Sequence, residues 1–208
     1  MSRFIECYHC HGDAFDNELQ ESCDTCGGAG EIDLDRPNIH IHSDLEGIHH
    51  ARKAGERSKC KKFKIGAALV IDGVIIRTSY NGTEPGDDLE CEHDCLICNG
   101  TGVGFDEICF NCNGTGLSSY DRVRHAERNI TDWAKLNGID ISEGTIYVTL
   151  QPCLACATLI QEAGIKRVVY IYTYKNNDGL DHLFKHGVEF SELFSRDTGP
   201  FPHPIEIP

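Results

Sequence analysis

The sequence predicts an α/β protein in which helices cover both faces of a mixed sheet of about five strands, with small cysteine-rich insertions. Two observations across the 208 residues predict this. After residue 43, apolar runs of strand length alternate with segments whose apolar residues recur at helical spacing. Cysteine pairs and glycines are concentrated in segments 1–36 and 87–119, which are too short to form an apolar core of their own. We therefore expect an N-terminal cysteine module, and a domain over 37–208 that a second module interrupts.

The first expected elements of the domain are a helix and a hairpin. Residues 43–58 begin with a serine suited to cap a helix and continue with an acidic first turn. Apolar runs follow at 64–71 and 74–80. Asp72-Gly73 between them is a strong signal for a two-residue hairpin turn.

Helices and strands alternate through the rest of the domain. A helix at about 122–137 ends at an Asn-Gly pair, and a strand at 145–150 follows it. The pattern continues with a helix at 153–163, a strand at 167–172, a helix at 179–186 and a short strand at 188–190. This alternation after an opening hairpin is typical of a mixed sheet between two helical layers.

Net charge bears on the class of partner. The chain has 19 basic and 33 acidic residues, a formal charge of −14, which counts against binding nucleic acid over a broad surface. A local basic pocket for one small phosphorylated ligand is compatible with this charge. The chain has no apolar run of membrane-spanning length, and its N-terminus is too polar for a secretory signal, so we expect a cytoplasmic protein without membrane contact.

Cysteine spacing indicates metal binding. Ten of the twelve cysteines form five Cys-x-x-Cys pairs: Cys7–Cys10, Cys23–Cys26, Cys95–Cys98, Cys109–Cys112 and Cys153–Cys156. Thiols in the cytosol stay reduced, so zinc is a better explanation than disulfides, and the alternative is buried cysteines acting as small hydrophobic residues. Glycine-rich turns follow the first four pairs. Three of these resemble the Cys-x-x-Cys-x-Gly-x-Gly repeat of DnaJ-type chaperones, which implies a zinc-knuckle geometry and no chaperone activity, whereas the first has Ala14 in place of the last glycine.

The simplest assignment is one structural zinc in each module. Its ligands would be Cys7, Cys10, Cys23 and Cys26 in the first module, and Cys95, Cys98, Cys109 and Cys112 in the second. Such four-thiolate sites leave no position open for water, and metal binding would supply the folding free energy that these segments lack. Pairing across the two modules satisfies the same spacing.

The fifth pair has a different setting. Cys153 and Cys156 lie one turn apart where Pro152 can open a helix, and a helix N-terminus lowers thiol pKa values. His125, in the first turns of the preceding helix, would be a third ligand, which leaves one position open as in a catalytic zinc site. Glu127 could then take a proton from zinc-bound water. The alternative is a core histidine and a solvated helix carboxylate.

These residues resemble the signature of a known enzyme superfamily. His125-Ala126-Glu127 with Pro152-Cys153-Leu154-Ala155-Cys156 is similar to the H-x-E…P-C-x-x-C signature of zinc-dependent cytidine deaminases. Within that superfamily the closest resemblance is to deoxycytidylate (dCMP) deaminases of phages and bacteria. The stretches that carry it are SKCKKFKIGAALV at 58–70, SYNGTEPG at 79–86, HAERN at 125–129, GTIYVTLQPCLACATLIQEAGIKRVVY at 144–170, and Tyr174. The resemblance implies a three-layer cytidine-deaminase-like fold.

The resemblance also implies a reaction. It is hydrolytic deamination of dCMP to dUMP with release of ammonia, a step towards thymidylate, in which Glu127 carries a proton to the ring and then to the leaving amine. It further implies that Asn81 bonds the sugar hydroxyl, that backbone at Ala67 bonds the base, that Lys64 binds the phosphate and that Tyr174 packs on the nucleotide. Asn81 and the glycine after it also fit a plain turn at a strand end.

Two cysteines remain outside the pairs. Cys60 and Cys91 stand where phage-type relatives place two ligands of a further structural zinc. His93 would be a third ligand here and His49 or His50 a fourth, and the rival interpretation is two reduced, unliganded thiols. The resemblance thus implies one catalytic zinc and two or three structural ones.

The family resemblance also bears on oligomeric state and regulation, and other functions are compatible with the same zinc signature. Family members are often hexamers regulated by dCTP and dTTP with Mg²⁺, so a homo-oligomer with these effectors is implied. The alternative functions are deamination of another cytosine nucleotide or of tRNA adenosine, and a non-catalytic zinc-knuckle protein on a deaminase scaffold. The charge of −14 counts against tRNA. The intact set of His125, Glu127, Cys153 and Cys156 counts against a scaffold without catalysis.

Overall fold

The computed structural model describes residues 39–84, 89–104, 107–174 and 176–193 in full. Before residue 39 it describes only the backbone of short strands: β1 (Phe4–Glu6), which pairs with β4 (Glu31–Asp33), and β2 (Phe15–Asp16), which pairs with β3 (Glu21–Ser22). The predicted zinc ligands of the first module, Cys7, Cys10, Cys23 and Cys26, lie outside the described residues.

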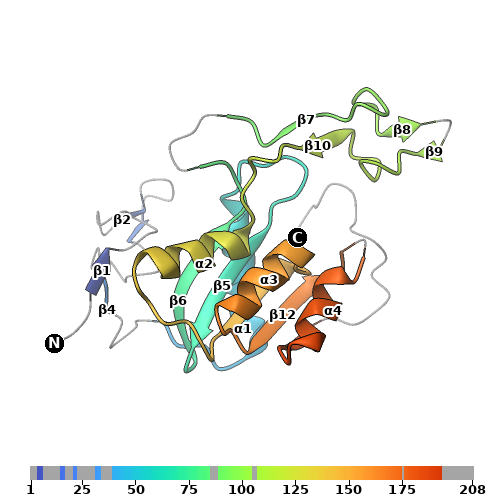
Figure 1. The fold of residues 1–208 in the computed structure, drawn as a ribbon. Coiled ribbons are helices and arrows are strands. Elements are labelled where there is room, and N and C mark those ends of the chain that lie inside the picture. The colour runs from blue at the N-terminus through green and yellow to red at the C-terminus, as the bar shows by residue number, and fades with distance from the viewer. Residues whose placement is uncertain are drawn as a thin grey trace.

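A mixed five-stranded sheet forms the centre of the domain, in the order β13-β12-β11-β5-β6 (Figure 1). Its strands are β5 (Gly66–Ile71), β6 (Val74–Tyr80), β11 (Thr145–Leu150), β12 (Arg167–Tyr172) and β13 (Glu189–Glu192). β5 is antiparallel to both β6 and β11, whereas β11, β12 and β13 run parallel. The predicted α/β class and mixed sheet are confirmed.

Helices cover both faces of this sheet. α1 (Asp44–Glu56) packs on one face, and α2 (Ala126–Leu136), α3 (Leu154–Glu162) and α4 (Asp178–Lys185) pack on the other (Figure 1). No helix in the described ranges is long and apolar enough to cross a membrane.

Alternation along the buried strands divides the core into two layers. Leu69 and Val168 belong to the cluster beneath α2, α3 and α4, while their neighbours Val70 and Val169 belong to the cluster beneath α1. Because successive strand side chains point to opposite faces, a strand buried on both sides reads as a continuous apolar run. The continuous apolar runs that predicted these strands therefore reflect burial on both faces of the sheet.

The opening hairpin has the predicted turn. Asp72 and Gly73 both have positive φ, 51° and 76°, as a type I′ turn requires. This turn connects β5 directly to β6 and so fixes their antiparallel register.

Two helices begin later than predicted. α2 begins at Ala126 instead of 122, because the backbone of Arg124 exchanges hydrogen bonds with Gly82 and cannot be helical. His125 is therefore the N-cap, with extended φ and ψ of −79° and 153°. α3 begins at Leu154, and Cys153 is likewise an N-cap with extended backbone. These corrections place two of the predicted metal ligands at helix starts.

The second cysteine module begins and ends in a two-stranded stem, in which β7 (Glu92–Asp94) pairs with β10 (Leu117–Ser119). A second pair, β8 (Val103–Gly104) with β9 (Glu107–Ile108), lies between these two strands in the sequence. Figure 1 shows this segment leaving the helix-covered sheet near the N-terminal end of α2 and extending beyond it. The stem returns the chain directly to the residues that precede His125.

Candidate metal centre and active-site pocket

His125, Cys153 and Cys156 lie together at the N-termini of α2 and α3. The Nδ1 atom of His125 is 3.3 Å from Sγ of Cys156 and 3.5 Å from Sγ of Cys153, and the three donor atoms all lie within 4.8 Å of one another. A tetrahedral zinc with one nitrogen and two sulfur ligands separates nitrogen from sulfur by about 3.5 Å. The donor set therefore fits zinc and leaves one coordination position for water or substrate.

Hydrogen bonding favours the thiolate form of one of the two cysteines, Cys153. The pKa of Cys153 falls to about 4, because the Cys156 thiol and the His125 ring hydrogen-bond to its thiolate. The same interactions raise the pKa of His125 through its bond to Cys153. The pKa of Cys156 is raised, because it keeps the shared proton and is buried. A metal ion would displace that proton, since thiolates are the form that binds zinc.

Glu127 lies in the first turn of α2 and is only 3% exposed. Because His125 caps the helix with extended backbone, Glu127 and His125 can both line one pocket although they are two residues apart. Burial raises the pKa of Glu127 above its ordinary value. A buried carboxyl beside the candidate metal ligands is placed to accept and donate a proton, as general acid–base catalysis requires.

The pocket in front of these residues has a volume of about 470 Å³. The candidate centre contributes His125, Glu127 and Cys153, with Leu150, Gln151 and Tyr174 beside them. The segment before β5 contributes Lys62, Phe63 and Ile65, and Asn81 follows β6. The module and its junction contribute Glu92, Asn111, Ser118, Ser119, Tyr120, Asp121 and Val123. This volume is in the range of small-molecule sites.

The structure brings two of the four predicted substrate residues to this pocket. Asn81 and Tyr174 line it. The Asn81 side chain accepts a hydrogen bond from the backbone N–H of Ile65 at 2.8 Å and donates one to the carbonyl of Phe63 at 2.9 Å, so it also holds the segment before β5.

Ala67 and Lys64 are not among the residues that line the pocket. Ala67 is fully buried in the core within β5. The Lys64 ammonium donates to the carbonyl of Glu56 at 3.3 Å, at the end of α1. Lys62 lines the pocket instead, and the sequence analysis missed it because three lysines lie within four residues of one another.

Gln151 is a second pocket residue that the sequence analysis missed. Its buried side chain donates to the carbonyl of Asn176 at 2.8 Å and accepts from the backbone N–H of Tyr174 at 3.2 Å. Its position directly before the Pro-Cys pair was the available signal. Gln151 thus holds the segment that carries Tyr174 against the end of β11.

The four cysteines of the second module form a separate buried group. Sγ of Cys95 lies 3.9 Å from that of Cys109, and Sγ of Cys98 lies 3.7 Å from that of Cys112. All four sulfurs lie within 4.8 Å of one another, and four sulfurs around zinc would be about 3.8 Å apart. Asn111 donates to Sγ of Cys95 at 3.3 Å and so lowers the pKa of Cys95 to about 5. The group fits a closed site made within one module.

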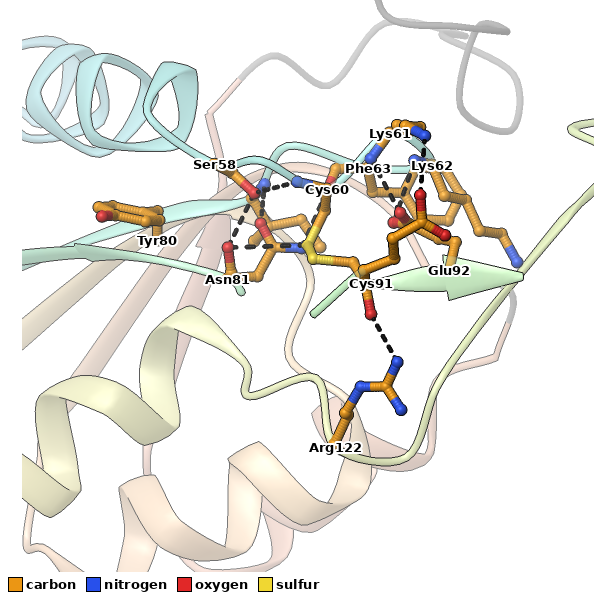
Figure 2. Close-up of a disulfide and its surroundings, with 12 residues drawn as sticks. Ser58, Cys60, Lys61, Lys62, Phe63, Tyr80, Asn81, Cys91, Glu92 and Arg122 are labelled. Atoms are coloured by element: carbon orange, nitrogen blue, oxygen red, sulfur yellow. Dashed lines mark hydrogen bonds and ion pairs between the residues drawn. A yellow bond between two sulfur atoms is a disulfide. The ribbon is translucent and has the colours of Figure 1, made fainter. Parts of the chain in front are cut away.

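Cys60 and Cys91 are joined as a disulfide, which differs from both the predicted zinc site and the predicted free thiols (Figure 2). The loop after α1 and the start of the stem converge here, and their Cα atoms are 5.3 Å apart, within disulfide range. The third side chain of metal-binding type beside them is Glu92, not His93. The His93 ring packs against Tyr120, and its Nδ1 lies 2.7 Å from the carbonyl of Asp94.

A mixed sheet that presents an imidazole, two thiols and a buried carboxylate at two helix N-termini is the arrangement of zinc-dependent deaminases. The family model for the cytidine and deoxycytidylate deaminase zinc-binding region matches residues 41–172, and this chain belongs to that family. The family resemblance that the sequence predicted is confirmed.

Individual relatives agree with this assignment. The deoxycytidylate deaminase of Enterobacteria phage T2 is 32% identical over 157 residues, which cover 64% of this chain and 83% of the relative. That of Enterobacteria phage T4 is 34% identical over 157 residues, covering 64% and 81%. Among solved structures, the dCMP deaminase from cyanophage S-TIM5 in complex with dCMP and dUMP has a TM-score of 0.58 and 27% identity, over 74% of this chain and 100% of that one.

Proposed function

We propose that this protein is a zinc-dependent deaminase that hydrolyses dCMP to dUMP and releases ammonia. The observation that carries the proposal is the open donor set of His125, Cys153 and Cys156 with the buried carboxyl of Glu127 in the same pocket. Relatives named deoxycytidylate deaminase, and a similar structure in complex with dCMP and dUMP, support dCMP as the substrate.

The residues of the site have distinct roles in this proposal. His125, Cys153 and Cys156 would hold zinc, which lowers the pKa of bound water to about 7 and so supplies a nucleophile at neutral pH. Glu127 would accept the proton of that water and deliver it to ring nitrogen N3 as the water oxygen bonds to C4. It would then take the proton of the hydroxyl group added at C4 and pass it to the amino group, which would leave as ammonia when its bond to C4 breaks and the C4 carbonyl of dUMP forms. Its burial and raised pKa suit it to both transfers.

Substrate contacts follow from the pocket. We assign Asn81 to the sugar and Tyr174 to packing on the nucleotide, as the family resemblance implies, and both residues line the pocket. Ala67 would act only through its backbone, since its side chain is buried in the core. For the phosphate we favour Lys62 over Lys64, because Lys62 lines the pocket and Lys64 does not.

The metal content has a catalytic and a structural part. The catalytic site would hold one zinc, and the Cys95–Cys98–Cys109–Cys112 group another, closed one. With a comparable site at Cys7, Cys10, Cys23 and Cys26, we expect about three zinc ions per chain. A cytoplasmic location is the expectation from the sequence. The family resemblance alone supports a homo-oligomer, a hexamer, with dCTP and dTTP as effectors and Mg²⁺ accompanying them.

The test is ammonia release from four compounds: dCMP, dCTP, deoxycytidine and an adenosine-containing tRNA. We expect rapid turnover of dCMP alone. Faster turnover of dCTP or deoxycytidine than of dCMP would show that dCMP is not the preferred substrate. Turnover of the tRNA would show that the protein is a tRNA adenosine deaminase and not a deaminase of cytosine nucleotides. Activity on none of the compounds by the zinc-loaded protein would refute the proposal and favour a non-catalytic protein.

A further inference from the structure

The second cysteine module contributes residues to the pocket of the candidate metal centre. Asn111 lies between two of its cysteines, Ser118 and Ser119 lie on β10, and Glu92 lies on β7. Proton transfer at Glu127 requires none of these side chains. We propose that this module is the outer wall of the nucleotide pocket and faces the phosphate of the substrate. The proposal rests on the proposed function.

The inner end of the pocket determines where the phosphate must lie. The ring that reacts has to meet His125, Cys153 and Glu127, because the candidate zinc site and the proton carrier are there. The phosphate of a nucleoside monophosphate is separated from the ring by the sugar. It must therefore lie away from those residues, and we assign it to the part of the lining that the module forms together with Lys62, because Lys62 is the cationic side chain there.

The polar groups at that wall suit a phosphate. Among the described residues that line the pocket, Lys62 is the only lysine or arginine. Ser118 and Ser119 offer hydroxyl groups, and Asn111 offers an amide. An ammonium and neutral donors are the groups that bind phosphate in proteins.

Glu92 is also at this wall, and a carboxylate would oppose a phosphate unless its charge were engaged. It is only 6% exposed, and its two oxygens accept the backbone N–H groups of Lys61 at 3.1 Å and Lys62 at 3.2 Å (Figure 2). Both oxygens are thus occupied by the segment that carries Lys62. Strand β7 of the module therefore positions Lys62, while β10 supplies two further lining residues, Ser118 and Ser119.

The conformation of this wall depends on the cysteine group. The module's described residues form one buried cluster, which consists of Cys95, Cys98, Cys109 and Cys112. The large apolar side chains that are described in the module are outside that cluster, and Leu96 and Phe110 are 80% and 81% exposed. Among its described residues, the module has no apolar core that could hold the wall in place without the cysteine group. Asn111 links the two features, since it donates to Cys95 and lines the pocket.

A pair of opposite charges at Ser119 tests the proposal. Ser119 is exposed, so Ser119→Glu and Ser119→Lys should both fold. Leu96→Glu and Leu96→Lys are the matched controls, because they change the net charge of the same module equally at an exposed residue that does not line the pocket. The readouts are the dissociation constants of dUMP and deoxyuridine, and KM and kcat for dCMP.

We expect the sign of the charge to matter only when the ligand carries a phosphate. Ser119→Glu should weaken dUMP binding and raise KM for dCMP about tenfold, while Ser119→Lys should tighten binding. Deoxyuridine binding and kcat should change less than about twofold, as should every value for the Leu96 variants. Equal effects of the two Ser119 variants, or equal effects on dUMP and deoxyuridine, would overturn the proposal. Failure of the unmodified protein to bind dUMP or turn over dCMP would instead refute the proposed function, and this proposal with it.

Discussion

The close approach of helix α1 to strand β5 makes a specific prediction about Gly66. A Cβ atom at Gly66 would lie 1.8 Å from the carbonyl oxygen of Ala51 and 2.4 Å from the backbone nitrogen of Gly55. Non-bonded heavy atoms need about 3.5 Å, so Gly66→Ala must push α1 away from the sheet by roughly 1.5 Å. Both contacts are with backbone, and neither can be relieved by a side-chain rotation.

The expected loss of stability follows from that displacement. Overpacking a core typically costs about 1–3 kcal/mol, and a clash with the backbone of a buried helix belongs at the upper end. About 3 kcal/mol corresponds to a decrease of roughly 6–12 °C in Tm for a protein of this size. The assay is thermal and urea unfolding of the metal-loaded protein, followed by circular dichroism.

Gly82→Ala is the matched control, because a Cβ there would have no heavy atom within 4 Å. Its free energy of unfolding should stay within about 0.5 kcal/mol of the unmodified protein. If Gly66→Ala unfolded at the same temperature as Gly82→Ala, the reasoning about the α1–β5 contact would be refuted.

Three further predictions concern the rest of the framework. Arg167 donates to both carboxylate oxygens of Asp44 at 2.7 Å and lowers its pKa, so Asp44→Asn should cost about 1–2 kcal/mol at pH 7. The pKa of Asp44 is lower in the folded than in the unfolded protein. The difference in unfolding free energy between the two proteins is therefore fully present above the unfolded value of about 3.9 and should shrink as pH falls through the folded value. An equal difference at pH 7 and pH 2 in urea titrations would contradict this prediction. Cys98→Ser should remove about one zinc per chain in elemental analysis, and an unchanged zinc content would argue against the four-cysteine site. The Cys60–Cys91 disulfide closes a sequence separation of 31 residues, so the double serine variant should lose about 3–4 kcal/mol; equal stability, or two extra free thiols in the unreduced, unfolded protein, would contradict the bond.

Local signals predicted most of the fold. The Asp72-Gly73 turn depends only on its own two residues, and the strands depend on apolar runs that are buried on both faces. The start of α2 was predicted wrongly because a long-range contact sets it. Arg124 pairs with Gly82, far away in sequence, and this pairing keeps the residues before Ala126 extended.

In the candidate site, too, local motifs predicted some residues, whereas the positions of others depend on contacts between segments far apart in the sequence. The His-x-Glu and Pro-Cys-x-x-Cys spacings identify His125, Glu127 and Cys153, because each motif lies at a helix start and carries its own geometry. Spacing could not select Lys62 over Lys64, since the choice depends on Glu92, which holds the backbone of the segment from a strand thirty residues later.

The pairing of Cys60 with Cys91 has the same cause. The two residues meet because the loop after α1 and the stem of the module converge, which no local pattern records. The family resemblance had already placed Cys60 and Cys91 in one site, as zinc ligands, and only His93 was chosen because it follows Cys91 closely in sequence. The ring of His93 instead packs against Tyr120.

The most direct test of the central claim is single-turnover deamination of dCMP by Glu127→Gln and by the unmodified protein, with zinc content and dUMP affinity measured on the same samples. Glutamine keeps the shape of the buried side chain but cannot carry the proton. We expect the rate to fall by about 10³-fold or more, while zinc content and the dUMP dissociation constant stay within about twofold. A variant that deaminates dCMP at the unmodified rate with its zinc in place would contradict the account.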